Sequence, residues 1–193
     1  AHFKERHEAS REKAQLCIDV AKYEKSVVNK DTNTISIYVG MPFCPTRCVY
    51  CSFTANPIGK AKSLVKEYIE ALSKEIASIS EYVKSKNLKI ETVYFGGGTP
   101  TSVNNEEFEE VMSKIYHAFV EGNEVKEFTV ECGRVDSITK EKLESMKRYK
   151  VDRISINPQT LNDKTLKLIG RNHNTEAVYE CFKTARELGF DNI

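Results

Sequence analysis

The sequence predicts an α/β fold, a partial TIM-like (βα) barrel. Short alternating stretches typical of strands and longer stretches with helical spacing follow one another in the order β-α-β-α-β-α-β-α-α-β. Strands that alternate with helices pair in parallel through right-handed crossovers. This order also fits an open doubly wound sheet. Polar residues follow each of the first four strands, however, and four successive strands that bring polar groups to one rim favour a barrel, whole or partial.

The elements can be placed from the periodicity of the apolar residues. Strands are expected at 35–39, 92–95, 128–130, 154–156 and 191–193. Helices are expected at 3–28, 64–83, 104–119, 139–146, 162–169 and 178–188. Asn104 and Glu107 form a capping-box pattern, and Gly189 suits the end of the last helix. We therefore expect an N-terminal helical extension at 1–33 and a barrel at 34–193, truncated at its C-terminal side after four to five βα units.

Composition and charge exclude several classes of protein. The 193 residues include 29 basic and 28 acidic side chains, a net charge of +1 that favours neither nucleic acid nor an anionic membrane as a partner. No apolar run approaches the roughly 20 residues that span a bilayer, and residues 1–15 lack the apolar core of a secretory signal. Three of the six cysteines lie within eight residues and the others are scattered, which is typical of a metal site in a reducing compartment. We expect a cytoplasmic protein.

The clustered cysteines are Cys44, Cys48 and Cys51, spaced C-x3-C-x2-C on the loop after the first strand. Thiolates are the usual ligands of iron–sulfur clusters, and three on one short loop can bind three corners of a [4Fe–4S] cube. The fourth iron would keep an open position for a small molecule, as catalytic metals do. A structural zinc site and a chance clustering are the alternatives. A zinc site needs a fourth ligand, however, and His2, His7, His117 and His173 are all distant in sequence.

With Tyr50 directly before the third cysteine, this spacing resembles the signature of the radical S-adenosylmethionine (SAM) superfamily. The segments Tyr38-Val-Gly-Met-Pro-Phe-Cys44 and Ile156-Asn-Pro-Gln159-Thr further resemble the oxygen-independent coproporphyrinogen III oxidase family, most of all its coproporphyrinogen dehydrogenase branch of HemZ-like and HemN-like proteins. The resemblance covers nearly the whole chain from about residue 34. It implies a radical SAM barrel with a [4Fe–4S] cluster and SAM as cofactors.

The resemblance also implies a set of SAM contacts. Gly96-Gly97-Gly98-Thr99-Pro100-Thr101 matches the family segment that holds the amino end of SAM, although a glycine run alone could be a tight turn. A solvated carboxylate, a surface arginine and a core tyrosine are the alternatives for Glu131, Arg171 and Tyr38. The residues implied to contact SAM are Tyr38, Tyr50, Gly97, Gly98, Thr99, Glu131, Gln159 and Arg171.

By the same resemblance, the substrate is coproporphyrinogen III, which hydrogen abstraction and decarboxylation convert to protoporphyrinogen IX. A porphyrinogen or heme and an electron donor such as flavodoxin or ferredoxin would be the partners. A heme chaperone or heme-modifying relative that keeps the cluster is the alternative. Two departures matter here: Phe53 replaces a fourth cysteine of the best-known dehydrogenases, and Cys132-Gly133-Arg134 replaces Asn-Pro or Asp-Pro. We expect little or no turnover from residues 1–193 alone.

Overall fold

The computed structural model describes residues 8–28, 31–53 and 56–193. It divides into two compact units, Ala1–Thr34 and Ile35–Ile193. In the first unit, helix α2 (Arg11–Glu24) begins after Ser10, whose hydroxyl accepts a hydrogen bond from the Lys13 amide. None of the residues of α2 is buried. The predicted helix at 3–28 is thus found over its central part, while its first residues lie outside the described ranges.

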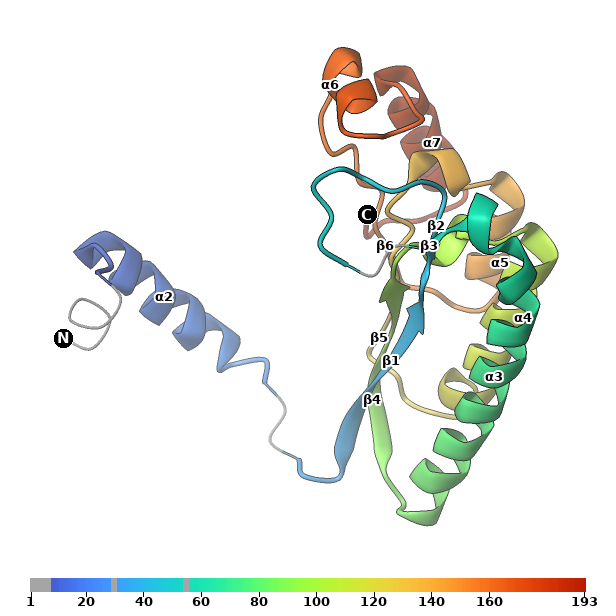
Figure 1. The fold of residues 1–193 in the computed structure, drawn as a ribbon. Coiled ribbons are helices and arrows are strands. Elements are labelled where there is room, and N and C mark those ends of the chain that lie inside the picture. Colours follow the sequence, from blue (N-terminus) through green and yellow to red (C-terminus); the bar gives the residue numbers. More distant parts are fainter. Residues whose placement is uncertain (1–7, 29–30, 54–55) are drawn as a thin grey trace. The chain divides into compact units, whose positions relative to one another are not determined.

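The second unit contains a four-stranded sheet (Figure 1). Its strands are arranged in the order β1-β4-β5-β6. They are β1 (Thr34–Met41), β4 (Lys89–Gly97), β5 (Glu127–Val130) and β6 (Arg153–Ile154). β5 pairs in parallel with β4 and with β6, and a parallel bridge from Arg153 to Asn192 begins the predicted fifth strand. This order and direction agree with βα units laid side by side.

Helices connect successive strands. In Figure 1 the chain runs along β1, returns through the long helix α3 and then enters β4. The helices are α3 (Ile58–Ser85), α4 (Asn105–Ile115), α5 (Lys140–Arg148), α6 (Asp163–Leu168) and α7 (Thr175–Glu187), with short turns η1 (Pro100–Ser102), η2 (Tyr116–Val120) and η3 (Val135–Ser137). The predicted capping box is confirmed: the Asn104 and Glu107 side chains each accept a hydrogen bond from the other's amide.

The two faces of the sheet differ in character because successive strand residues point to opposite sides. Val39 and Phe95 belong to the buried core with the apolar sides of α3 and α4. Tyr38 and Tyr94 are on the opposite face, where their rings stack with centroids 5.9 Å apart. Tyr38 is 64% exposed, so the alternative that it is a core residue is wrong.

The loop after β1 contains a second, smaller pairing that the sequence did not predict. β2 (Phe43–Cys44) pairs in parallel with β3 (Asn56–Pro57). This pair closes the base of the loop that contains the three clustered cysteines. The loop therefore starts and ends at a fixed place beside the first turn of α3.

Candidate functional site

One cavity gathers almost all of the predicted site residues. It has a volume of about 190 Å³ and is lined from the loops that follow β1, β4, β5 and β6. Its lining residues are Cys44, Cys48, Tyr50, Cys51, Phe53, Gly97, Gly98, Thr99, Glu131, Gly133, Arg134, Asn157, Gln159 and Arg171. Parallel strands place their carboxyl ends at one edge, which is why residues so distant in sequence meet here.

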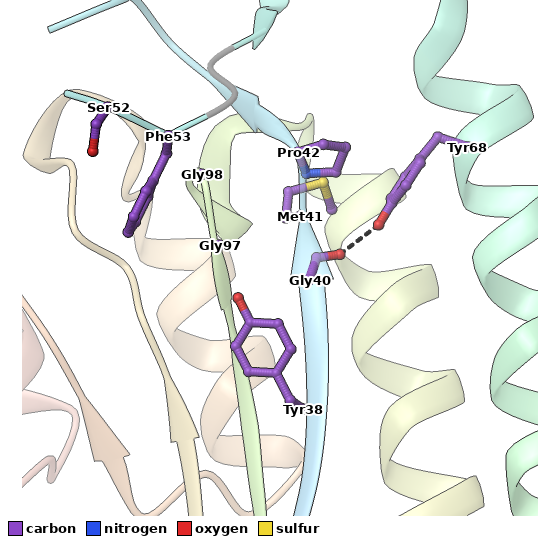
Figure 2. A pocket seen from close by; sticks show the side chains of 9 residues that line it. All are labelled: Tyr38, Gly40, Met41, Pro42, Ser52, Phe53, Tyr68, Gly97 and Gly98. Carbon is purple, nitrogen blue, oxygen red and sulfur yellow. Dashed lines mark hydrogen bonds between the residues drawn. The ribbon is translucent and has the colours of Figure 1, made fainter.

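Tyr38 is the predicted site residue that does not line this cavity. It lines a neighbouring cavity of about 520 Å³ together with Gly40, Met41 and Tyr68 (Figure 2). Phe53, Gly97 and Gly98 line both cavities. The two spaces therefore meet at the glycine run and Phe53, and Tyr38 lines only the larger one.

The cysteine loop is fastened to a segment more than 100 residues away. The Thr46 hydroxyl donates to the Gly170 carbonyl (2.8 Å), and the Val49 amide donates to the Ile169 carbonyl (3.2 Å). Gly170 has φ +80°, and a Cβ there would lie 2.8 Å from the Arg47 carbonyl oxygen. The turn between α6 and α7 thus holds the cysteine loop in place, and only glycine permits so close an approach.

The donor set of the cavity fits an iron–sulfur cluster. All six cysteines are free thiols, and three of them line the cavity without any histidine. Within the described ranges, no three His, Cys, Asp or Glu side chains are grouped around a position for a single metal ion. Thiolates of a cluster bind separate iron atoms and stand further apart than the ligands of one zinc ion. Three thiols from one loop line the cavity and can each bind a separate iron, and the cavity lining contains no histidine as a fourth ligand for zinc.

The Cys44 thiol shows how the cavity acts on these ligands. Burial raises the pKa of Cys44 above its ordinary value, and a hydrogen bond from the Thr99 hydroxyl (3.5 Å) and the charge of Arg134 oppose this increase. Metal ligation requires the thiolate. The hydroxyl and the guanidinium therefore favour the form of Cys44 that binds metal.

The glycine run has a packing role that neither the tight-turn nor the ligand interpretation anticipated. The Gly98 amide donates to the Met41 carbonyl (2.6 Å), and the Thr99 amide donates to the Phe43 carbonyl (2.8 Å). A Cβ at Gly98 would lie 2.7 Å from the Phe43 oxygen and 3.0 Å from the Cys44 sulfur. The end of β4 thus passes directly against the chain that leads into the cysteine loop.

Glu131 follows β5 and is half-buried in the cavity wall. Burial and the neighbouring Glu131 carboxylate both raise the pKa of Tyr94. The carboxylate thus lies beside the stacked tyrosines and faces the cavity.

Arg171 is the centre of a polar group at the other side of the cavity. Its guanidinium donates to the Gln159 amide oxygen (2.7 Å), the Tyr50 hydroxyl (2.9 Å) and the Gly133 carbonyl (3.2 Å). Arg171 is 8% exposed, so the alternative of a surface arginine is wrong. In the part of the chain that the structure describes, it makes no ion pair, and these partners are all neutral. Its positive charge remains available for an anionic group in the cavity.

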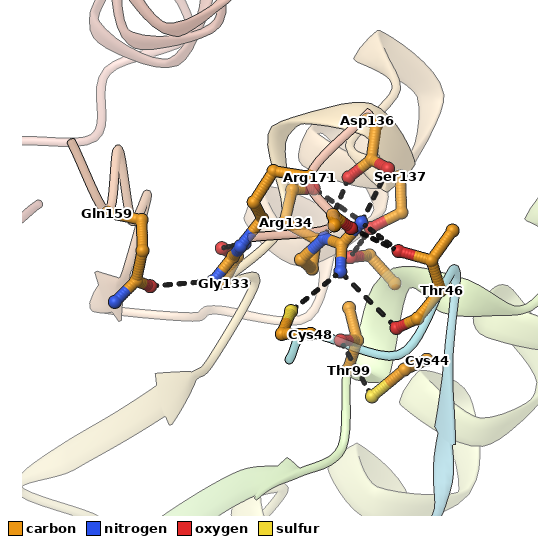
Figure 3. A network of polar contacts seen from close by, with 12 residues as sticks. Cys44, Thr46, Cys48, Thr99, Gly133, Arg134, Asp136, Ser137, Gln159 and Arg171 are labelled. Atoms are coloured by element: carbon orange, nitrogen blue, oxygen red, sulfur yellow. Dashed lines mark hydrogen bonds and ion pairs between the residues drawn. The ribbon is translucent and has the colours of Figure 1, made fainter. Parts of the chain in front are cut away.

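Arg134 is a functional candidate that the sequence reasoning missed. It is 3% exposed, and its guanidinium lies between Asp136 and the cysteine loop, where it donates to the Cys48 sulfur (3.3 Å) (Figure 3). The sequence did contain an indication of it, because Cys132-Gly133-Arg134 stands where the family resembled has Asn-Pro or Asp-Pro. A basic residue in the loop after a strand end of such a sheet lies at the same rim as the cysteines.

The chain belongs to the radical SAM superfamily, whose profile matches residues 38–193. Among curated relatives, the oxygen-independent coproporphyrinogen-III oxidase-like protein HemZ of Bacillus subtilis is 43% identical over 159 residues, which cover 82% of this chain and 32% of that protein. The heme chaperone HemW of the same organism is 37% identical over 158 residues, which cover 82% of this chain and 40% of that protein. The chain thus spans about a third of the length of these relatives.

The solved structures agree on the fold. Coproporphyrinogen III oxidase (HemN) from Escherichia coli superposes with a TM-score of 0.71 at 23% identity, covering 88% of this chain and 38% of that one. HydG, a maturase of the [FeFe]-hydrogenase, superposes with a TM-score of 0.55 at 15% identity, covering 95% and 39%. The predicted partial radical SAM barrel is therefore confirmed, and members of this superfamily use a [4Fe–4S] cluster and SAM. Across the described residues, no helix is long and apolar enough to cross a bilayer.

Proposed function

We propose that Cys44, Cys48 and Cys51 bind three irons of a [4Fe–4S] cluster and that SAM occupies the adjoining cavity. The observation that carries this proposal is the single cavity lined by all three thiols together with Gly97, Thr99, Glu131, Gln159 and Arg171. Thiolates from one loop and polar groups from three further strand ends converge there. This arrangement supports binding of a metal cluster and of a polar ligand side by side.

When bound, the cluster and SAM supply one-electron chemistry that ends in hydrogen abstraction from a substrate. The residues of this chain bind and orient. The positive charge of the Arg171 guanidinium, whose hydrogen-bond partners in the protein are all neutral, is suited to a carboxylate. The Glu131 carboxylate is suited to an ammonium group or a pair of hydroxyls, and the Tyr50 hydroxyl keeps Arg171 in place from the cysteine loop.

For the whole protein, we propose a tetrapyrrole substrate and oxidative decarboxylation of coproporphyrinogen III to protoporphyrinogen IX without oxygen. The names of the HemZ and HemN relatives support this choice. The similarity to HemW favours a second candidate, a heme chaperone that keeps the cluster. Phe53 lines both cavities and offers an apolar aromatic surface to a tetrapyrrole in either case. A flavodoxin or ferredoxin in the cytoplasm would supply the electron.

The cluster assignment is tested by anaerobic reconstitution with iron and sulfide. Each of Cys44→Ser, Cys48→Ser and Cys51→Ser should lose most of the bound iron, the acid-labile sulfide and the broad visible absorbance. Cys17→Ser is the matched control because Cys17 is exposed and lies in the other compact unit. Full uptake by any of the three site variants would refute the assignment.

The choice between enzyme and chaperone needs the full-length protein. With SAM, a low-potential reductant, an electron acceptor and coproporphyrinogen III, the enzyme should release carbon dioxide, methionine, 5′-deoxyadenosine and protoporphyrinogen IX over several turnovers. A chaperone should instead bind heme stoichiometrically and leave coproporphyrinogen III unchanged. Arg171→Met should abolish SAM binding in equilibrium dialysis in either case, since both candidates use the same cavity.

A further inference from the structure

The Arg134 guanidinium is fully occupied by contacts inside the protein. Its Nε and Nη2 atoms donate to the two carboxylate oxygens of Asp136, at 3.0 and 2.8 Å. Nη2 also donates to the Thr46 hydroxyl (2.9 Å), and Nη1 donates to the Thr46 carbonyl (3.4 Å) and the Cys48 sulfur (3.3 Å). These contacts use all five N–H groups of an arginine side chain. A guanidinium held this way has one fixed orientation.

Burial strengthens the interaction of the Arg134 guanidinium with its neighbours. The Arg134 side chain is 4% exposed and that of Asp136 is 12% exposed. Buried charges interact more strongly than exposed ones because water does not screen them. Asp136 lies on the far side of the guanidinium from Cys48 (Figure 3), so the N–H group that reaches the sulfur faces it directly. The charge and the hydrogen bond therefore act together on one sulfur atom.

We propose that Arg134 is a positioning residue that raises the reduction potential of the cluster through Cys48. This inference rests on the proposed role of Cys48 as an iron ligand. Reduction by one electron from a low-potential donor adds negative charge that spreads onto the cluster sulfurs. Hydrogen bonds to those sulfurs and nearby positive charge stabilise the reduced form, and both are known controls of cluster potentials. Arg134 supplies the hydrogen bond, and its ion pair with Asp136 turns the positive end toward Cys48.

The same side chain fixes the loop that contains the ligand. Thr46 accepts from Arg134 at its hydroxyl and donates from that hydroxyl to Gly170. Arg134 thus connects the turn after β5 to the cysteine loop and, through Thr46, to the turn before α7. A purely structural role would use these contacts alone, whereas control of the potential requires the bond to Cys48.

The test is an anaerobic redox titration of the reconstituted protein, followed by electron paramagnetic resonance of the reduced cluster. Arg134→Met removes charge and donors, Arg134→Gln keeps neutral N–H groups, and Arg134→Lys keeps the charge. Arg134→Met should lower the equilibrium constant for reduction at least tenfold, about 59 mV for one electron. The reduction potential of the cluster in Arg134→Gln should lie between those of Arg134→Met and the wild type. In Arg134→Lys it should lie close to that of the wild type. Arg148→Met is the control, because it removes one positive charge at a side chain that is 62% exposed. The reduction potential of the cluster should not change in this variant.

A second readout distinguishes the bond to sulfur from loop fixing. Resonance Raman frequencies of the iron–cysteine stretches should rise in Arg134→Met, because a sulfur without its hydrogen bond binds iron more strongly. Normal iron and sulfide content with an unchanged potential would overturn the inference and leave the proposed function intact. Loss of the cluster in all three Arg134 variants would also overturn it, in favour of a structural role. Failure of the wild-type protein to assemble a cluster would instead refute the proposed function, and this inference with it.

Discussion

Replacing Gly98 by alanine tests whether the contact between the end of β4 and the cysteine loop forms the site. The added Cβ would lie 2.7 Å from the Phe43 carbonyl oxygen, 2.9 Å from the Met41 oxygen and 3.0 Å from the Cys44 sulfur. Two of these atoms belong to backbone that accepts hydrogen bonds from Gly98 and Thr99. They cannot move without lengthening those bonds. The segment must nevertheless shift by about 0.7 Å to reach ordinary contact at 3.4 Å.

The cost can be estimated from these contacts. Overpacking of this kind costs about 1–3 kcal/mol, and weakening of the two backbone hydrogen bonds adds about 1 kcal/mol. We therefore expect Gly98→Ala to lower the free energy of unfolding by about 2–4 kcal/mol. Because one of the crowded atoms is the Cys44 sulfur, we also expect the variant to take up less iron and sulfide.

Gly59→Ala is the matched control. Gly59 lies in the first turn of α3, and a Cβ there would meet nothing within 4 Å. Alanine is favoured over glycine in a helix by up to about 1 kcal/mol. The same chemical change should therefore stabilise the protein at Gly59 and destabilise it at Gly98.

Urea unfolding followed by circular dichroism measures the free energy of unfolding of both variants, and anaerobic reconstitution measures their iron and sulfide. A Gly98→Ala protein as stable as Gly59→Ala, with a full cluster, would refute the packing argument. A stable Gly98→Ala protein without cluster would show that the strain is confined to the ligand loop. That result would locate the effect at Cys44 and leave the sheet unaffected.

Three further predictions concern stability and thiol chemistry. Asn104→Ala removes the capping box of α4 and should cost about 1 kcal/mol of unfolding free energy, and an unchanged urea midpoint would contradict this. Burial raises the pKa of Cys132 far above its ordinary value. Above about pH 8.5 only the unfolded chain therefore releases this proton, so this thiol should lower the free energy of unfolding by about 1.4 kcal/mol per pH unit. Cys132→Ala should lack this part of the slope. Iodoacetamide should label exposed Cys17 in the native protein and leave Cys132 unmodified until urea unfolds the chain, as mass spectrometry can show.

Much of the fold follows from the sequence because periodicity reflects which face of an element is buried. The alternation around Ile37 and Val39 in β1, and the helical spacing from Val65 to Val83 in α3, both match buried positions in the structure. The predicted strand at 154–156 is an exception. Ile156 was placed in it, but β6 ends at Ile154. The alternation continues in the sequence, whereas strand pairing depends on a partner that ends at Val130.

The site was predictable to the extent that parallel strands bring their ends together. The three thiols, Glu131 and Gln159 line one cavity because they follow the ends of β1, β5 and β6, respectively. The contacts between these loops were not predictable. Arg171 contacts Tyr50 across 121 residues, and Thr46 contacts Gly170 across 124, and no local pattern encodes either pair. Such contacts depend on how loops pack once the sheet has formed.

The departure at Cys132-Gly133-Arg134 has a physical explanation in these loop contacts. The Gly133 amide donates to the Ser155 carbonyl, and the Arg134 amide donates to the Cys132 carbonyl. A proline at either position would remove one of these donors. Gly133 has φ +56°, which turns the chain so that the Arg134 side chain points back toward the cysteine loop. The turn at Gly133 and the position of the Arg134 guanidinium beside Cys48 are therefore parts of one local structure, which a proline at position 133 or 134 would disturb.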